Sequence, residues 1–194
     1  MKLGFFGGTF DPIHIGHLII AEWVWETLAL EQIVFVPAGE PPHKDSEQIT
    51  PVQHRLTMVK LAVQGNPHFA VSDFEAYLPG KSYTVGTLRQ LRFRYGDTAQ
   101  LYWLIGSDSL LELPNWRQPD ELFRLAQIVV YPRPGFPVVA ADEDFRRQAV
   151  LLEAPELNLA ASQIRQRLRL GQSCRYLLPP DVAGYIDANA LYRS

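Results

Sequence analysis

Residues 7–17 decide the fold, and they read Gly7-Gly8-Thr9-Phe10-Asp11-Pro12-Ile13-His14-Ile15-Gly16-His17. An apolar run, residues 3–6, precedes this stretch, and apolar residues with helical spacing follow it over residues 18–28. This order predicts a buried strand, a glycine turn and a helix. In an open α/β sheet such turns lie at the carboxyl ends of the strands, where ligands bind. We therefore expect a ligand site at the first turn of the chain.

The residue types in this turn favour a phosphate ligand. Gly7 and Gly8 are expected to let the backbone approach a ligand and adopt positive φ. The N–H groups and the dipole at the start of the following helix favour an anion. His14 and His17 lie three residues apart, which puts them on one helical face, where they can donate hydrogen bonds and carry charge when protonated. The stretch is interpreted as a polyphosphate site.

Other readings of the same residues are weaker. The stretch contains neither a P-loop nor a G-x-G-x-x-G fingerprint. Two histidines are too few for a closed metal site, and no cysteine cluster assists them, so no protein-held metal is predicted. A purely structural turn with two capping or solvated histidines is the remaining alternative. Two glycines, two histidines and an aspartate within eleven residues favour phosphate handling over it.

Composition limits the class of protein. The chain has 194 residues, of which 47% are hydrophobic and 20% charged, as in an ordinary globular protein. We expect one domain over residues 1–194, with residues 155–194 as its C-terminal helical part. The net charge of −3 and the lack of a Lys/Arg block argue against a nucleic-acid partner. The single cysteine, Cys174, and the absence of a signal peptide or membrane-length apolar run predict a cytoplasmic protein without membrane contact.

The rest of the chain alternates strands with helices, which predicts a doubly wound, mainly parallel α/β sheet. Further strands are expected at residues 32–37, 69–74, 101–105, 127–131 and 150–152. Helices are expected near residues 15–29, 51–64, 81–95, 110–113, 119–125, 140–149 and 158–170. Thr50 is expected to cap the second of these helices, and Ser82 or Thr84 the third.

Residues 7–17 closely resemble the signature of the nucleotidyltransferase superfamily that carries an HxGH motif. Its members join a nucleoside triphosphate to a phosphorylated partner and release pyrophosphate. The signature alone leaves open cytidylyl-, pantetheine-phosphate and nicotinate-nucleotide adenylyltransferases. Later stretches resemble the nicotinate-nucleotide branch: Pro-Pro-His-Lys at 41–44, Ser-Tyr-Thr at 82–84, residues 106–116, and Arg-Pro-Gly at 133–135. The resemblance runs in the same order from residue 4 to about residue 193.

This resemblance implies a Rossmann-like fold and adenylyl transfer from ATP to nicotinate mononucleotide. It assigns catalysis to His14, His17, Lys44 and Arg165. It assigns ATP binding to Gly7, Gly8, Thr9, Phe10, His17, Gly106, Asp108, Arg133, Ser162, Ile164 and Arg165. It assigns nicotinate mononucleotide binding to Thr9, Asp11, Lys44, Thr84 and Trp116. Mg²⁺ is expected to arrive with ATP, since the sequence shows no dedicated carboxylate cage.

Several assignments have plain alternatives. Lys44 alone reads as a solvated loop lysine, and Asp108 and Ser162 as helix caps. Ala160 and Ala161 stand where the family usually has hydroxyls. Trp116 is expected to stack on the pyridine ring, and backbone N–H groups near Thr84 and Trp116 to bind its carboxylate without a basic side chain.

Two other functions remain as alternatives. One is pantetheine-phosphate adenylyltransferase, against which the Ser-Tyr-Thr and Pro-Asn-Trp stretches argue. The other is a non-catalytic sensor of ATP or a pyridine nucleotide, against which the histidine pair and Lys44 argue. The sequence leaves homo-oligomer formation open, as well as the strength of any preference for the acid over the amide acceptor.

Overall fold

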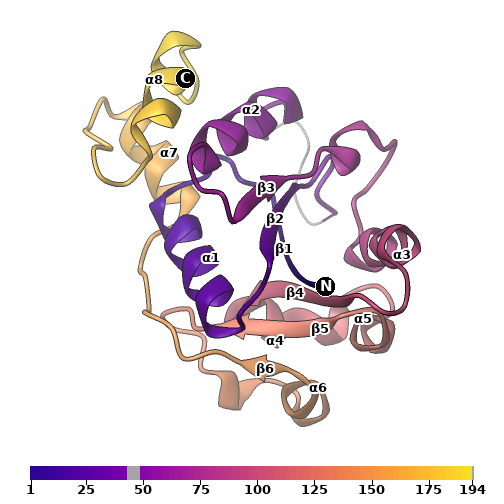
Figure 1. Ribbon diagram of the computed structural model, residues 1–194. Helices are drawn as coiled ribbons and strands as arrows, with labels where there is room; N and C mark the ends of the chain where they lie inside the picture. Colours follow the sequence, from indigo (N-terminus) through magenta and orange to yellow (C-terminus); the bar gives the residue numbers. More distant parts are fainter. Residues whose placement is uncertain (43–48, 194) are drawn as a thin grey trace.

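One sheet of six parallel strands forms the centre of the molecule (Figure 1). The computed structural model describes residues 1–42 and 49–193. The strands are β1 (Lys2–Gly8), β2 (Gln32–Pro37), β3 (Phe69–Val71), β4 (Gln100–Gly106), β5 (Gln127–Tyr131) and β6 (Val150–Leu151). Their order in the sheet is β3-β2-β1-β4-β5-β6. The doubly wound parallel architecture expected from the sequence is confirmed.

Helices cover both faces of this sheet (Figure 1). The α-helices are α1 (Ile15–Thr27), α2 (Val52–Val63), α3 (Thr84–Tyr95), α4 (Ser107–Glu112), α5 (Pro119–Leu125), α6 (Glu143–Gln148), α7 (Ala161–Arg169) and α8 (Pro180–Ala188). Short 3₁₀ turns are η2 (Phe74–Tyr77), η3 (Leu113–Asn115) and η4 (Val138–Ala140).

After a polar first residue in four of them, the strands are almost continuously apolar, because helices cover both faces of the sheet. Phe6 packs with α1, α2, α7 and α8 on one face, whereas its neighbour Phe5 packs with α3, α4, α5 and α6 on the other. Successive side chains of a strand point to opposite faces, so one apolar run supplies two core layers. The C-terminal helices join the first layer through Ile164, Val182 and Ile186.

Two helix starts differ from the expected ones. Helix α2 has Pro51 at its N-cap instead of Thr50, whose carbonyl accepts a hydrogen bond from Arg55 Nε at 2.8 Å. Helix α3 has Tyr83 at its N-cap, and Ser82 Oγ instead accepts the N–H of Gly39 at 3.1 Å. These side chains and backbone groups tie loops together, which propensity alone does not reveal.

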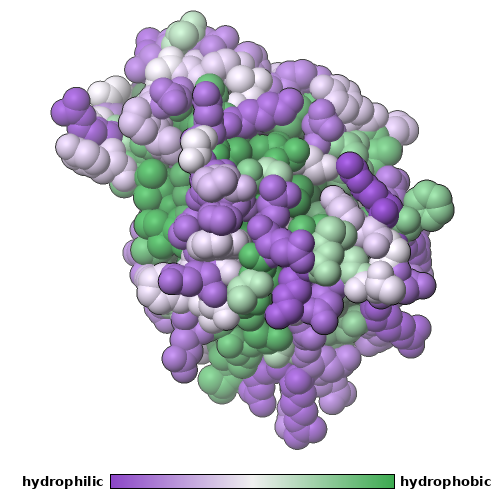
Figure 2. Space-filling view, in the orientation of Figure 1, coloured by the Kyte–Doolittle hydropathy of each residue, from purple (hydrophilic) through white to green (hydrophobic). Residues whose placement is uncertain are grey.

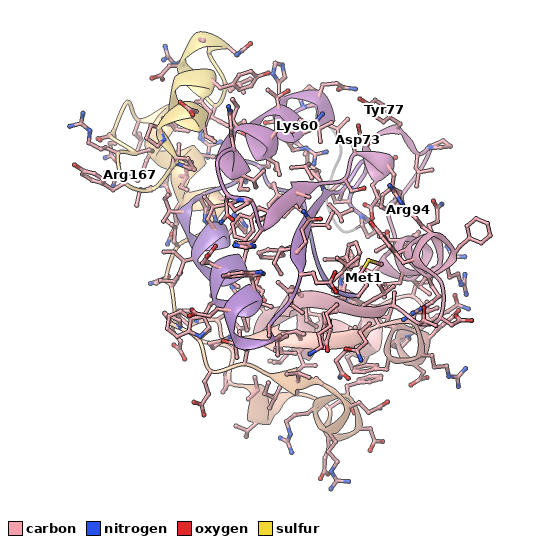
Figure 3. The ribbon with its side chains drawn as sticks, viewed as in Figure 1. Met1, Lys60, Asp73, Tyr77, Arg94 and Arg167 are labelled. Carbon is pink, nitrogen blue, oxygen red and sulfur yellow. The ribbon has the colours of Figure 1, made fainter. Side chains whose placement is uncertain are left out.

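The visible surface is mostly polar (Figure 2). Polar side chains are spread over the face in Figure 2, with apolar atoms between them. On helix α7, Arg167 projects from the C-terminal part of the chain (Figure 3), and its Nη2 donates to the Ser173 carbonyl at 2.9 Å. Across residues 1–42 and 49–193, no helix is both long and apolar enough to cross a bilayer.

Candidate functional site

A cavity of about 200 Å³ opens where the strand order reverses between β1 and β4. Its walls come from the ends of β1 and β4, the loop after β2, the start of α3 and the turn after η3. Such a switch point is where open α/β sheets bind ligands. The cavity is lined by residues expected at both substrates, namely Gly7, Gly8, Thr9, Gly106, Thr84 and Trp116. We call it the acceptor cavity.

A second, smaller cavity contains the histidine pair. Its lining includes His14, His17 and Arg133 together with Gly16 at the start of α1. Phe6 and Tyr131 line both cavities, so the two spaces lie on either side of these rings. We call the second space the histidine cavity. The fold thus places two groups of expected site residues next to each other.

The two histidine rings are stacked, with centroids 3.7 Å apart. His14 is the N-cap of α1, and its backbone N–H donates to Nδ1 of His17 at 3.2 Å. Because Nδ1 accepts this bond, the proton of a neutral His17 ring lies on Nε2. His17 therefore has a ring N–H donor whose tautomer is fixed by the helix start.

His14 is neutral at pH 7, which revises the expectation that the pair carries charge. Only 4% of the residue is exposed, and burial lowers the pKa of His14 to about 4, with the nearby charge of Arg133 as a smaller cause. Among the described residues, no group forms a hydrogen bond with its buried Nδ1. His14 can act as a hydrogen-bonding group in this state, and the fixed positive charge of the histidine cavity comes from Arg133.

The depressed pKa of His14 makes stability pH-dependent. The unfolded chain takes up a proton near pH 6.5 and the folded chain only near pH 4, so stability is lost as the pH falls through this window. We expect a loss of about 3 kcal/mol between pH 7 and pH 4 from this residue, at 1.36 kcal/mol per pKa unit. Urea unfolding at several pH values, compared with His14→Asn, measures it. Equal pH slopes in the two proteins would contradict this account.

Gly7 and Gly8 lack the expected positive φ, and their surroundings give a further reason for a residue without a side chain. Neither has positive φ; the positive φ in this turn belongs to Phe10, at 49°. A Cβ on Gly7 would lie 2.3 Å from the Trp103 ring, and one on Gly8 would lie 3.0 Å from the Phe10 ring. The two glycines therefore make room for aromatic rings in and beside the acceptor cavity.

Beyond β4, Asp108 and Arg133 form an ion pair with 3.5 Å between Oδ2 and Nε. About a third of each side chain is exposed, so both remain accessible. Asp108 Oδ1 also accepts the N–H of Ser109 at 3.0 Å, so the side chain serves the helix start as well. A Cβ on Gly106 would lie 2.3 Å from Asp108 Oδ1 and 2.8 Å from Arg133 Cδ, so a side chain here would displace this ion pair.

The expected acceptor residue Asp11 is structural in this fold. It is 4% exposed; Oδ1 accepts from the Tyr192 hydroxyl at 2.6 Å and Oδ2 from the N–H of Thr50 at 3.4 Å. Arg165 Nη1 donates to the Asp11 carbonyl at 2.7 Å. Arg165 thus fastens α7 to the signature turn, and the Asp11 carboxylate holds the C-terminal segment instead of facing a cavity.

Two further expected residues, Ile164 and Phe10, offer little side-chain surface to a ligand. Ile164 is fully buried in the core, and Phe10 is 3% exposed and packs edge-to-face against His17. Only their backbone groups remain for a contact with ATP. Ser162 is exposed in the first turn of α7, where Gln163 Oε1 accepts the Ala160 N–H at 3.0 Å. Lys44 lies outside the described residues.

Trp116 follows η3 and lines the acceptor cavity with Thr84, the first residue of α3. Its backbone N–H donates to the Leu113 carbonyl at 2.9 Å, so this donor is used within the turn. Glu75 lines the same wall; burial raises the pKa of its carboxyl, which accepts a short hydrogen bond from the Thr87 hydroxyl. The Trp116 N–H is therefore used within the turn, and a carboxylate held by the backbone here would need the other N–H groups near Thr84 and Trp116.

Sequence reasoning missed the buried Arg55. Its guanidinium donates to the carbonyls of Thr9 and Ala38, both at 2.7 Å, and of Gly39 at 2.8 Å. These carbonyls follow β1 and β2, so Arg55 joins the two loops that frame the acceptor cavity. The only sequence signal is an arginine on the apolar face of a helix, which is uncommon unless its donors are satisfied.

Comparisons with known proteins agree with this geometry. A family profile described as cytidylyltransferase-like matches residues 5–167. A protein of Thermomicrobium roseum named "probable nicotinate-nucleotide adenylyltransferase" is 47% identical, over 100% of this chain and 92% of its own length. A protein of Dehalococcoides mccartyi with the same name is 41% identical, over 99% and 97%.

A solved structure also resembles the chain in fold. The Plasmodium falciparum nicotinic acid mononucleotide adenylyltransferase, complexed with NaAD, superposes with a TM-score of 0.83. The match covers 98% of this chain and 97% of that one at 19% identity. At this identity the likeness concerns the fold, and it matches the sheet described above.

Proposed function

Because this chain belongs to the nicotinate-nucleotide adenylyltransferase family, we propose that it transfers the adenylyl group of ATP to nicotinate mononucleotide. The products are nicotinate adenine dinucleotide and pyrophosphate. The 5′-phosphate of the mononucleotide attacks the α-phosphorus of ATP in line, and the bond from that phosphorus to the pyrophosphate oxygen breaks. The attacking phosphate is already anionic, so the step needs positioning and charge stabilisation more than a strong base.

The observation that carries this proposal is the pair of adjoining cavities. The histidine cavity offers His14, His17 and Arg133 to the phosphates of ATP. The acceptor cavity offers Trp116 and the start of α3 to a pyridine nucleotide. Phe6 and Tyr131 lie between them, which is where donor and acceptor phosphates would meet.

The remaining parts of the proposal rest on the sequence. Lys44 and Arg165 are assigned to the phosphates, and Ser162 assists at the start of α7. ATP enters as its Mg²⁺ complex; among the described residues, no group of three or more acidic, histidine or cysteine side chains is placed to hold a metal. A cytoplasmic location is part of the same proposal, with the single cysteine as its support.

Product analysis tests this function. The protein is incubated with ATP, Mg²⁺ and one acceptor: nicotinate mononucleotide, nicotinamide mononucleotide or phosphopantetheine. We expect pyrophosphate and the deamido dinucleotide with nicotinate mononucleotide. Preferred turnover of phosphopantetheine would assign the other adenylyltransferase, and nucleotide binding without pyrophosphate release would indicate a sensor.

Trp116→Ala should specifically weaken acceptor binding. Loss of a stacking partner for the pyridine ring, with the apolar area it covers, is expected to raise KM for nicotinate mononucleotide about tenfold, or roughly 1.4 kcal/mol. KM for ATP should stay within a few-fold. Steady-state kinetics with each substrate varied in turn measures both values.

The matched control is Trp23→Ala, because Trp23 lies on α1 and its Nε1 donates to the Glu153 carbonyl, outside both cavities. We expect this variant to keep both KM values. Equal losses for both substrates in Trp116→Ala would show a folding defect. An unchanged KM for nicotinate mononucleotide would remove Trp116 from the acceptor site.

A further inference from the structure

Arg117 stands at the acceptor cavity beside the aromatic residue proposed to hold the pyridine ring. It lines this cavity together with Trp116, Tyr83 and Thr84. Its guanidinium carbon lies 5.0 Å from the centroid of the Tyr83 ring. Such a cation–π contact limits the directions that an exposed arginine samples. The positive charge of Arg117 is thereby held at the start of α3.

The surroundings leave this charge available for a ligand. Within residues 1–42 and 49–193, no carboxylate forms an ion pair with Arg117. Arg89, in the second turn of α3, gives a contrast. It forms an ion pair with Glu121 at 2.6 Å and also donates to Gln118 at 2.9 Å. An acidic side chain of α5 is thus used by Arg89 and not by Arg117.

The acceptor cavity has a second charged residue among those described, Glu75, and it does not cancel Arg117. The carboxyl of Glu75 is 4% exposed and is hydrogen-bonded to the Thr87 hydroxyl. The Glu75 carboxyl is therefore engaged within the wall of the cavity, below the start of α3. The dipole of α3 adds a positive potential at the same end of the cavity.

A ring carboxylate placed against Trp116 needs donors other than the N–H of Trp116 itself. The Trp116 N–H already donates to the Leu113 carbonyl. A guanidinium offers two parallel N–H donors in the geometry of a carboxylate, whereas a carboxamide presents one oxygen and an NH₂ group that an arginine cannot bind. This difference separates the acid from the amide form of the acceptor.

We propose that Arg117 is a specificity-determining residue that favours an acceptor bearing a ring carboxylate over the corresponding carboxamide. This inference rests on the proposed function and deepens it, because it names the side chain that distinguishes the two pyridine nucleotides. Trp116 contributes to binding of both, since stacking does not depend on the ring substituent. Arg117 contributes to the acid alone.

The test compares kcat/KM for nicotinate mononucleotide and nicotinamide mononucleotide in wild type, Arg117→Gln and Arg117→Lys. Glutamine keeps length and polarity but removes the charge. We expect Arg117→Gln to lower kcat/KM for the acid roughly tenfold, mainly through KM, because a charge-assisted pair is lost. The value for the amide should change less than about twofold. Arg117→Lys should recover part of the loss, since a point charge replaces a planar fork.

Arg94→Gln is the matched control. Arg94 lies on α3 (Figure 3), and it has a similar cation–π contact, with its guanidinium carbon 5.6 Å from the ring centroid of the neighbouring Tyr95. It does not line the acceptor cavity. The acid-to-amide selectivity of this variant should equal that of wild type.

The possible results distinguish the role of Arg117 from the proposed adenylyltransferase function on which it rests. If wild type turns over amide too slowly, the inhibition constant of nicotinamide mononucleotide against the acid replaces its kcat/KM. Unchanged selectivity in Arg117→Gln, or equal losses for acid and amide, would overturn the role of Arg117 while leaving the adenylyltransferase proposal standing. Failure of wild type to release pyrophosphate with either acceptor would instead overturn the proposed function.

Discussion

His17→Ala is expected to lower kcat by about two orders of magnitude or more, with a smaller change in KM for ATP. Negative charge builds on the leaving pyrophosphate as its bond to the α-phosphorus breaks, and a fixed donor aimed at that charge acts mainly in the transition state. His17 has the required property, because its Nδ1 accepts the His14 N–H and its ring proton lies on Nε2. Single-turnover and steady-state kinetics measure the loss.

Two roles of His17 need separate variants, since its ring both caps α1 and lines the histidine cavity. His17→Asn retains an acceptor near the position of Nδ1 but lacks a donor at the position of Nε2. It should restore stability relative to His17→Ala without restoring kcat. His68→Ala is the control, because that ring stacks on Trp25 away from both cavities. Near-normal kcat in His17→Asn would remove the Nε2 donor from the chemistry.

The fold could be predicted because its signals are local. Each buried strand is an apolar run of a few residues, and β2 and β5 have the expected bounds, Gln32–Pro37 and Gln127–Tyr131. Right-handed βαβ connections limit the strand orders that such a sequence can adopt. The turn after β1 was also identified for a local reason, namely glycines and histidines between a strand and a helix.

The finer structure of the site depends on contacts between distant residues. Position 7 needs a glycine because a side chain there would collide with the ring of Trp103, which lies in another strand. The expected cause, a positive φ, is not observed. Asp11 was assigned to a substrate, but it bonds Tyr192 from the far end of the chain. Arg117 has no sequence signal, because an arginine in a polar turn is ordinarily solvated. Such roles exist only once the fold has brought the partners together.

The second large effect concerns stability. Arg55 is 1% exposed, and four hydrogen bonds connect its guanidinium to carbonyls: those of Thr9, Ala38 and Gly39, and that of Thr50 at 2.8 Å. Burial lowers the pKa of Arg55, opposed in part by the negative charge of Asp11. A buried cation with this many satisfied donors is costly to remove, because its acceptors are then left without partners.

Arg55→Met is therefore expected to lower the free energy of unfolding by about 3–5 kcal/mol. Methionine fills much of the volume, so the loss reports the hydrogen bonds and charge more than a cavity. Urea unfolding at 15 °C measures this loss. The free energy of unfolding of Arg55→Lys should lie between those of wild type and Arg55→Met, because lysine keeps the charge but donates fewer hydrogen bonds. Since Thr9 and Ala38 line the acceptor cavity, the folded fraction of Arg55→Met should also show a raised KM for the acceptor.

Arg92→Met is the matched control, because Arg92 also donates to three carbonyls: Gly96 at 3.0 Å, Ala99 at 2.8 Å and Leu125 at 2.5 Å. These bonds tie the end of α3 to β4 and α5, outside both cavities. Arg92 is partly exposed, so water can replace some of its bonds, and the loss should be nearer 1–2 kcal/mol with KM unchanged. If Arg55→Met cost no more than Arg92→Met and left the acceptor KM unchanged, Arg55 would not be the link that holds the two cavity loops.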